Sequence, residues 1–502
     1  MFAKSSLLTA LGMVIAALGS AAAALGSAAA SSSFQLTKLD AAIPQALGGR
    51  CMDGTMAGFY VRKGTDGGAT FAIFLQGGGG CNDQTGCTKR AKTELGSSKG
   101  LKPTELPKPI NSGSAPMLDA DCSKNPDFCT ATAVYVPYCS SDAWVGNRTS
   151  ADDTSWGFYF SGHANFARIV DALVQTHGLG GADNTRVLLS GQSAGGIGTI
   201  RNIDSLQQRL GSRISVKASP NAGWFDPAAL PSDLPYPDPP SDYAHFANGT
   251  HGNSGADAAA TEFVYDTLYQ GKGVVNQACI AAQPTGHWWA CVSSHFVYKY
   301  IAAPLFVVEN MFDSYQIYNE MGAPQNPSAD QTPVLENYVA MYGEAMRNST
   351  AQVLHDAPVA PKAQKDGLFL PSCVKHIVDT KTKITSGSIQ YDWLTVLGDW
   401  FFERGAMADG YRLVESCPSE QPCHPGCSLP GPSPGPSPGP SPGPPTPGPG
   451  NACETALEKN GCLPASTPYK CKSCAKDHAA AMLLHCTEAE VKSLCNATSD
   501  QW

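Results

Sequence analysis

The stretch Arg186-Val187-Leu188-Leu189-Ser190-Gly191-Gln192-Ser193-Ala194-Gly195-Gly196 decides the fold prediction for this chain. Its first residues form a short apolar run, which is typical of a buried parallel strand, and the residues after it favour a helix. Ser193 therefore lies at a sharp strand-to-helix turn, where flanking glycines tolerate strained backbone and leave room around the serine oxygen. The amide of Ala194 is placed where a developing oxyanion can bind. The pattern predicts a nucleophilic serine on an α/β fold.

Three further short apolar runs predict buried parallel strands at 71–75, 133–136 and 305–308, in addition to 186–189. Between the second and third of these four runs, apolar residues repeat at helical spacing over 166–174, which predicts a βαβ unit. Further helices are expected at 333–347 and 391–403, and loops at 231–256. We therefore predict an α/β-hydrolase-like, mostly parallel sheet flanked by helices.

The first 30 residues predict a secretory signal peptide. Lys4 precedes an apolar stretch over 7–18, and small residues lead to a cleavage site near Ala30. A transmembrane anchor is the alternative, but the apolar stretch is short and contains glycine. We expect a secreted protein, in the extracellular space or cell wall, whose 18 cysteines pair in an oxidising compartment. Four sequons are then candidates for glycosylation, at Asn147, Asn248, Asn348 and Asn496.

Proline and glycine divide the mature chain into two folded units. Residues 430–450 contain only Pro, Gly and Ser apart from Thr446, and such a run favours extended polyproline II over a packed core. Twelve cysteines precede this run and six follow it, so each unit can close its own disulfides. We predict a catalytic domain at 31–428, a linker at 429–450 and a small six-cysteine module at 451–502. This module is expected to contact the cell wall or a glycan.

A nucleophilic serine requires a histidine base and a carboxylate that orients it, in the chain order Ser, Asp, His for this fold. Asp313 is the predicted acid because it lies in the turn after the strand at 305–308. Glu309 is its nearer rival, at the strand exit. His376 is the predicted base because Cys373 would pin its segment, and the alternatives are His355 and His424.

A second oxyanion donor is expected from the loop after the strand at 71–75, Gln76-Gly77-Gly78-Gly79-Gly80-Cys81, which a Cys81–Cys87 pair could clamp. A phosphate-binding loop is the competing interpretation, but no Gly-Lys-Ser/Thr follows.

In a secreted chain, disulfides are a stronger interpretation of the cysteines than other roles. The weaker alternatives are Cys139 as a nucleophile and metal sites at 423–427 and 471–474. We expect no metal or organic cofactor, and the net charge of −9 argues against a nucleic-acid partner.

Five ordered blocks of this chain resemble the pectin acetylesterase and Notum carboxylesterase family. They are the glycine loop at 75–81, Pro137-Tyr138-Cys139-Ser140-Ser141-Asp142-Ala143-Trp144, the serine turn at 191–196, Phe312-Asp313-Ser314-Tyr315-Gln316-Ile317, and Ser372-Cys373-Val374-Lys375-His376. The resemblance covers about residues 40–415 and none of the linker or tail.

The resemblance implies that Ser193, Asp313 and His376 form the catalytic triad and that the amides of Gly78, Gly79 and Ala194 form the oxyanion hole. It also implies an esterase that removes O-acetyl groups from pectin-like polysaccharide. The alternatives are removal of a fatty acyl group from a secreted protein, as in the Notum branch, and a catalytically inactive cell-wall or carbohydrate-binding protein. Family members usually carry an acidic residue at the position of Gln76 and an aromatic residue in the loop that here has Gly79 and Gly80. The missing aromatic leaves the pocket shape, and with it the acyl preference, open, but does not affect the triad. Trp144, Trp224 and Phe225 are expected to line a cleft or to fill the core.

Overall fold

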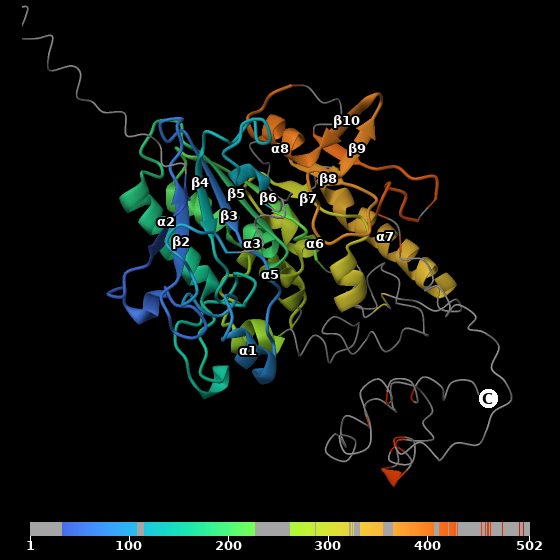
Figure 1. Ribbon diagram of the computed structural model, residues 1–502, viewed down its shortest axis with the longest axis horizontal. Coiled ribbons are helices and arrows are strands. Elements are labelled where there is room, and N and C mark those ends of the chain that lie inside the picture. The colour runs from blue at the N-terminus through green and yellow to red at the C-terminus, as the bar shows by residue number, and fades with distance from the viewer. Residues whose placement is uncertain are drawn as a thin grey trace, which may run out of the picture. The chain divides into compact units, whose positions relative to one another are not determined.

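A computed structural model describes the chain (Figure 1). Contact density divides it into two units, residues 1–433 and 434–502. Of the described part, no helix is long and apolar enough to cross a membrane. The structure describes residues 33–107, 115–225, 262–286, 288–320, 323, 325, 332–354, 365–405, 411–419, 421–427 and 429, together with 453, 457, 459, 460, 462, 474, 491 and 495.

Nine strands form one sheet in the order β1-β2-β4-β3-β5-β6-β7-β8-β11. The β1–β2 and β2–β4 pairs are antiparallel, and every pair from β4 to β11 is parallel. The carboxyl ends of these parallel strands therefore share one edge of the sheet. The strands are β1 (Gln35–Lys38), β2 (Gly58–Arg62), β3 (Thr70–Leu75), β4 (Thr132–Val136), β5 (Arg186–Gln192), β6 (Ser215–Asn221), β7 (Phe306–Val308), β8 (Gly367–Leu370) and β11 (Arg412–Val414), with a separate hairpin of β9 (Lys383–Ser386) and β10 (Ile389–Asp392).

Helices cover both faces of the sheet (Figure 1). Alternate strand residues face opposite sides, so Phe71 and Ile73 pack in a core with α2, α3 and α7, whereas Ala72 and Phe74 pack with α8. This arrangement buries the sheet on both sides, as its parallel strands require. The described α-helices are α1 (Gln84–Arg90), α2 (Gly162–His177), α3 (Ala194–Leu210), α5 (Gln277–Ala282), α6 (Ser294–Val297), α7 (Thr332–Leu354) and α8 (Trp393–Phe401).

The structure confirms the predicted α/β class and the four predicted strands, which correspond to β3, β4, β5 and β7. The helix predicted at 333–347 is α7, which is longer at both ends. The helix predicted at 391–403 begins too early, because Tyr391 and Asp392 belong to β10, and the Asp392 side chain accepts a hydrogen bond from the Thr395 amide as the N-cap of α8. Asp392 is therefore both the last residue of β10 and the N-cap of α8.

All twelve cysteines between 51 and 427 pair with one another, as their even number predicts. Cys139 pairs with Cys51, and Cys81 with Cys87, so the two sequence expectations for these residues are confirmed. The cysteines with metal-like spacing at 423 and 427 are also in disulfides. The remaining described bridges are Cys122–Cys129, Cys279–Cys291, Cys373–Cys427, Cys417–Cys423 and, in the C-terminal unit, Cys462–Cys474.

Two of the four sequon asparagines, Asn147 and Asn348, are described and exposed. Several sequence predictions concern segments that are not described. These are the signal peptide at 1–30, the loops at 231–256, His355, the linker, most of the module at 451–502, and the sequons at Asn248 and Asn496.

Candidate active site

Ser193 lies at the turn between β5 and α3 with φ 54° and ψ −125°. This is a conformation that a residue with a side chain rarely adopts, and such strain is characteristic of functional sites. The turn is possible because its neighbours are glycine: a Cβ on Gly195 would lie 2.1 Å from the Leu75 carbonyl oxygen, and one on Gly77 would lie 2.2 Å from the Gln192 carbonyl oxygen. The serine is therefore held against the start of the glycine loop.

The glycine loop follows β3 and is fixed by the neighbouring segment at 138–144. The side-chain carbonyl of Gln76 accepts the Tyr138 amide at 2.9 Å, and its backbone carbonyl accepts the indole N–H of Trp144 at 3.0 Å. Gly78 and Gly79 have φ of 141° and 65°, which favour glycine. Ala194, the other predicted donor, is the first residue of α3, where backbone N–H groups lack helical partners. The start of the glycine loop and the start of α3 therefore both lie beside Ser193.

Asp313 and His376 are in contact. The Nδ1 atom of His376 lies 2.8 Å and 3.0 Å from the two carboxylate oxygens of Asp313. Asp313 is fully buried and also accepts the amides of Tyr315 and Gln316 at 2.8 Å and 3.1 Å. The Nε2 atom of His376 is buried and has no hydrogen-bond partner among the described residues. The carboxylate therefore fixes the ring through Nδ1, and Nε2 remains able to take a proton.

Glu309, the rival acid, does not contact His376. Its carboxyl group is fully buried and accepts the Trp224 amide at 2.9 Å and the Asn310 amide at 3.2 Å. Burial raises the pKa of Glu309 well above its usual value, and the neighbouring Asp313 charge raises it further. Burial beside the Asp313 charge therefore favours the protonated form of Glu309. The sequence placed Glu309 near the site but did not indicate this protonation.

Asn221 connects the serine turn to the histidine segment, a role that the sequence analysis missed. Its backbone carbonyl accepts the Ser193 amide at 3.0 Å. Its side-chain amide donates to the Val378 carbonyl at 2.9 Å and accepts the Val378 amide at 3.1 Å, two residues beyond His376. The sequence does not indicate this role of Asn221, because the role depends on β6 lying between β5 and β7 in the sheet.

Two aromatic rings surround the imidazole of His376. The Tyr315 ring lies 5.0 Å from it between centroids at an interplanar angle of 30°, and the Phe225 ring meets it edge-on at 6.1 Å. The Tyr315 hydroxyl also lies 3.6 Å from the position that a Cβ on Gly79 would occupy. Tyr315 therefore extends from the imidazole to the glycine loop. Of the aromatic residues left open by the sequence, Phe225 contacts the site, whereas Trp144 and Trp224 are buried in the core.

His424, an alternative base, is paired elsewhere. Its Nδ1 atom lies 2.9 Å from Glu415, which also accepts the Ser372 amide at 2.8 Å. This pair supports the disulfide-linked segment that carries His376, since Cys373 pairs with Cys427. Among the described residues, no group of three or more His, Cys, Asp or Glu side chains could hold a metal ion.

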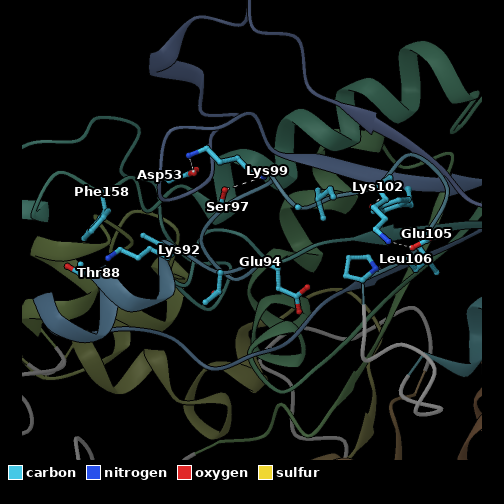
Figure 2. Close-up of a pocket in the computed structure, with 16 residues that line it drawn as sticks. Asp53, Thr88, Lys92, Glu94, Ser97, Lys99, Lys102, Glu105, Leu106 and Phe158 are labelled. Atoms are coloured by element: carbon cyan, nitrogen blue, oxygen red, sulfur yellow. Dashed lines mark hydrogen bonds and ion pairs between the residues drawn. The ribbon is translucent and has the colours of Figure 1, made fainter.

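A cavity of about 780 Å³ lies beside α1, and none of the predicted triad residues lines it (Figure 2). Its charged side chains balance: Lys99 pairs with Asp53 at 3.1 Å and Lys102 pairs with Glu105 at 2.6 Å, and the wall also contains Lys92 and Glu94. With three cations and three acids, the cavity has no net attraction for a charged ligand, and we assign it no role.

The chain is similar in sequence to known proteins over most of its length. The family model described as Pectinacetylesterase matches residues 27–428, which is most of the chain. Palmitoleoyl-protein carboxylesterase notum1a of Danio rerio is 28% identical over 398 residues, covering 75% of this chain and 70% of that protein. Pectin acetylesterase 11 of Arabidopsis thaliana is 27% identical over 405 residues, covering 78% of this chain and 92% of that protein.

The fold is also similar to that of a solved structure. The Wnt deacylase Notum from Drosophila superposes with a TM-score of 0.60 and 26% sequence identity, covering 77% of this chain and 97% of that chain. The similarity therefore extends over nearly the whole of that structure, and both groups of relatives are named for the hydrolysis of an ester.

Proposed function

We propose, from the premise that this chain belongs to the pectinacetylesterase family, that it is a serine esterase that removes O-acetyl groups from a pectin-like extracellular polysaccharide. Esterase chemistry is common to its relatives, and the choice of substrate is our proposal. The observation that carries it is the Asp313–His376 pair, whose unpartnered Nε2 lies after β8 at the same sheet edge as the Ser193 turn after β5.

In the acylation step, His376 Nε2 takes the proton of the Ser193 hydroxyl as the oxygen attacks the ester carbonyl carbon. The C–O double bond becomes a single bond, and the oxyanion binds the amides of Gly78, Gly79 and Ala194. The intermediate then expels the sugar oxygen, which receives the proton from His376 and leaves as a free hydroxyl. Asp313 orients the imidazole and stabilises its cationic form.

In the deacylation step, His376 removes a proton from water, whose oxygen attacks the acetyl-serine carbonyl. The bond to the Ser193 oxygen breaks, and the serine regains its proton from His376. Acetate is released. The sequence of steps uses only side chains and amides of this chain.

Tyr315 supports acetate over a fatty acyl group. Its ring covers the imidazole and its hydroxyl reaches the glycine loop, so it narrows the space beside the reacting carbonyl. The aromatic residue expected in the glycine loop from the family resemblance is absent here, and the Tyr315 hydroxyl lies 3.6 Å from the position of a Cβ on Gly79 in that loop. A narrow space admits a methyl group and excludes a long chain.

We expect the wild-type protein to release acetate from acetylated pectin and to hydrolyse p-nitrophenyl acetate faster than the octanoate, by roughly 100-fold in kcat/KM. Replacing Tyr315 by alanine should reduce this preference roughly 10-fold by admitting longer chains. Acyl-length profiles of both proteins, from acetate to octanoate, measure the effect.

Tyr315→Phe is the matched control, because it keeps the ring and removes only the hydroxyl, so its profile should stay close to wild type. A wild-type preference for octanoate would instead favour the alternative, removal of a fatty acyl group from a protein. Failure of a fluorophosphonate probe to label Ser193 would favour the inactive cell-wall protein.

Replacing Asn221 by alanine should lower kcat by roughly 10- to 100-fold, because the histidine segment would lose its link to the serine turn and small misplacements are costly. It also leaves the Val378 amide and carbonyl without partners, which costs about 1–3 kcal/mol of stability. Steady-state kinetics below the unfolding temperature measure the first effect.

Asn125→Ala is its matched control. Asn125 is also buried and donates to the carbonyls of Met117 and Asp119 at 3.1 Å and 2.8 Å. It is far in sequence from Asn221 and Val378 and lies on a different loop. It should lose stability without loss of kcat. Equal losses of kcat in both variants would contradict the role of Asn221.

The organisation of the chain around this enzyme is also part of the proposal. We infer that residues 1–30 direct secretion, since the six disulfides between 51 and 427 suit an oxidising compartment. The enzyme at 31–428 would act on the polysaccharide, and the module at 451–502, tethered by 429–450, would contact the wall or glycan.

A further inference from the structure

Arg90 is bound directly to the glycine loop. It is the last residue of α1, whose position is fixed by the Cys81–Cys87 disulfide and by the Asp83 cap on the Gly86 amide. Its Nη2 atom donates to the carbonyl oxygen of Gly78 at 2.6 Å, and its Nε atom donates to the Ser141 hydroxyl at 2.8 Å. A guanidinium, whose N–H donors form a rigid fork, is therefore anchored on this loop carbonyl.

The contact determines the direction of the next amide. In a planar trans peptide the carbonyl oxygen and the following N–H point to opposite sides, so holding the Gly78 oxygen toward Arg90 turns the Gly79 N–H away from it. Neither glycine restricts this peptide by itself, because a residue without a Cβ can adopt many backbone conformations. Leu95 packs against the Cα of Gly78, and this contact alone does not fix the rotation of the Gly78–Gly79 peptide.

We propose that Arg90 is a positioning residue of the oxyanion hole, which holds the Gly78–Gly79 peptide with its N–H facing the reacting carbonyl oxygen. The inference rests on the proposed esterase function. A charged donor forms a stronger hydrogen bond than a neutral one and polarises the peptide, so the N–H on the opposite side becomes a better donor. Arg90 does not touch the substrate, and acts only through this peptide.

The effect should appear in the transition state rather than in substrate binding. Loss of a whole oxyanion donor lowers kcat by about 100- to 1,000-fold. A donor that is present but no longer held in place should lower kcat by less. For Arg90→Met we expect kcat to fall roughly 10- to 100-fold with KM changed less than about threefold. The affinity for a trifluoromethyl ketone, whose adduct with Ser193 carries the oxyanion, should fall by the same factor as kcat/KM.

Two variants make the test specific. Arg90→Lys retains a cation that can donate to the Gly78 oxygen, so it should recover part of kcat and of ketone affinity. Lys89→Met removes a cation from the same last turn of α1 without a contact to the loop, and should match wild type. Thermal unfolding of each variant shows whether α1 and its disulfide remain folded.

The outcomes separate the two proposals. If the wild-type protein hydrolyses no ester, the proposed function itself fails. If it is active but Arg90→Met keeps kcat within twofold, or loses kcat while ketone affinity is unchanged, Arg90 does not position the oxyanion hole. If Arg90→Met does not fold, Arg90→Lys carries the test. A folded Arg90→Lys variant in which kcat/KM and ketone affinity change by the same factor supports the role of Arg90, and one that loses kcat while ketone affinity is unchanged overturns it.

Discussion

Replacing Ser193 by alanine is expected to lower kcat for p-nitrophenyl acetate by about 10⁶-fold, to the level of residual binding and oxyanion stabilisation. The reason is that the acyl-enzyme cannot form without the hydroxyl, whereas the Asp313–His376 pair and the glycine loop remain in place. Release of acetate from acetylated pectin should stop as well. Initial rates on both substrates measure the loss.

Ser190→Ala is the matched control for this prediction. Ser190 lies three residues earlier on β5, is also buried, and donates its hydroxyl to the Ser219 carbonyl at 2.7 Å. Its replacement should cost about 1 kcal/mol of stability and leave kcat within a few fold. Measurable turnover by Ser193→Ala, above about 1% of wild type, would remove Ser193 from the nucleophile role.

The serine turn and the glycine loop could be predicted because their backbone conformation is possible only with glycine at certain positions. A Cβ on Gly195 or Gly77 would collide with backbone atoms, so the local sequence carries the constraint in itself. The parallel strands could be predicted for a similar reason, since burial on both faces requires continuous apolar runs such as 71–75.

The supporting residues could not be predicted, because their roles arise only when distant segments meet. Asn221 acts through the order of β5, β6 and β7, and Arg90 acts because a disulfide folds α1 back onto the glycine loop. Glu309 and Asp313 both follow β7, and the sequence gives no physical reason for one to stay protonated. Only the complete burial of the pair decides their charges.

Replacing Glu309 by glutamine is expected to stabilise the protein at neutral and alkaline pH while activity is retained. Glutamine keeps an N–H donor toward Asp313 and an oxygen for the Trp224 amide, and it needs no proton, but its NH₂ group cannot accept the Asn310 amide. In the wild type, burial and then the Asp313 charge raise the pKa of Glu309 in the folded state above the value of 4.5 that it has when unfolded.

The sign of the pH dependence follows from proton binding. Between pH 4.5 and the raised pKa, folded Glu309 holds a proton that the unfolded chain releases, so its contribution to stability is full below pH 4.5 and is lost as pH rises. The loss is about 1.4 kcal/mol per pH unit, and Glu309→Gln lacks it. Urea unfolding from pH 4 to 9 should therefore show a difference between the two proteins that grows with pH.

Glu309→Ala distinguishes protonation from packing. Alanine leaves the amides of Trp224 and Asn310 without an acceptor, so this variant should be less stable at every pH, by about 2–4 kcal/mol. If the difference between Glu309→Gln and wild type were instead constant from pH 5 to 8, Glu309 would not change its proton occupancy on unfolding in that range. Glu309 would then be charged in the folded as in the unfolded chain at these pH values, and His376 would face a pair with two negative charges instead of one.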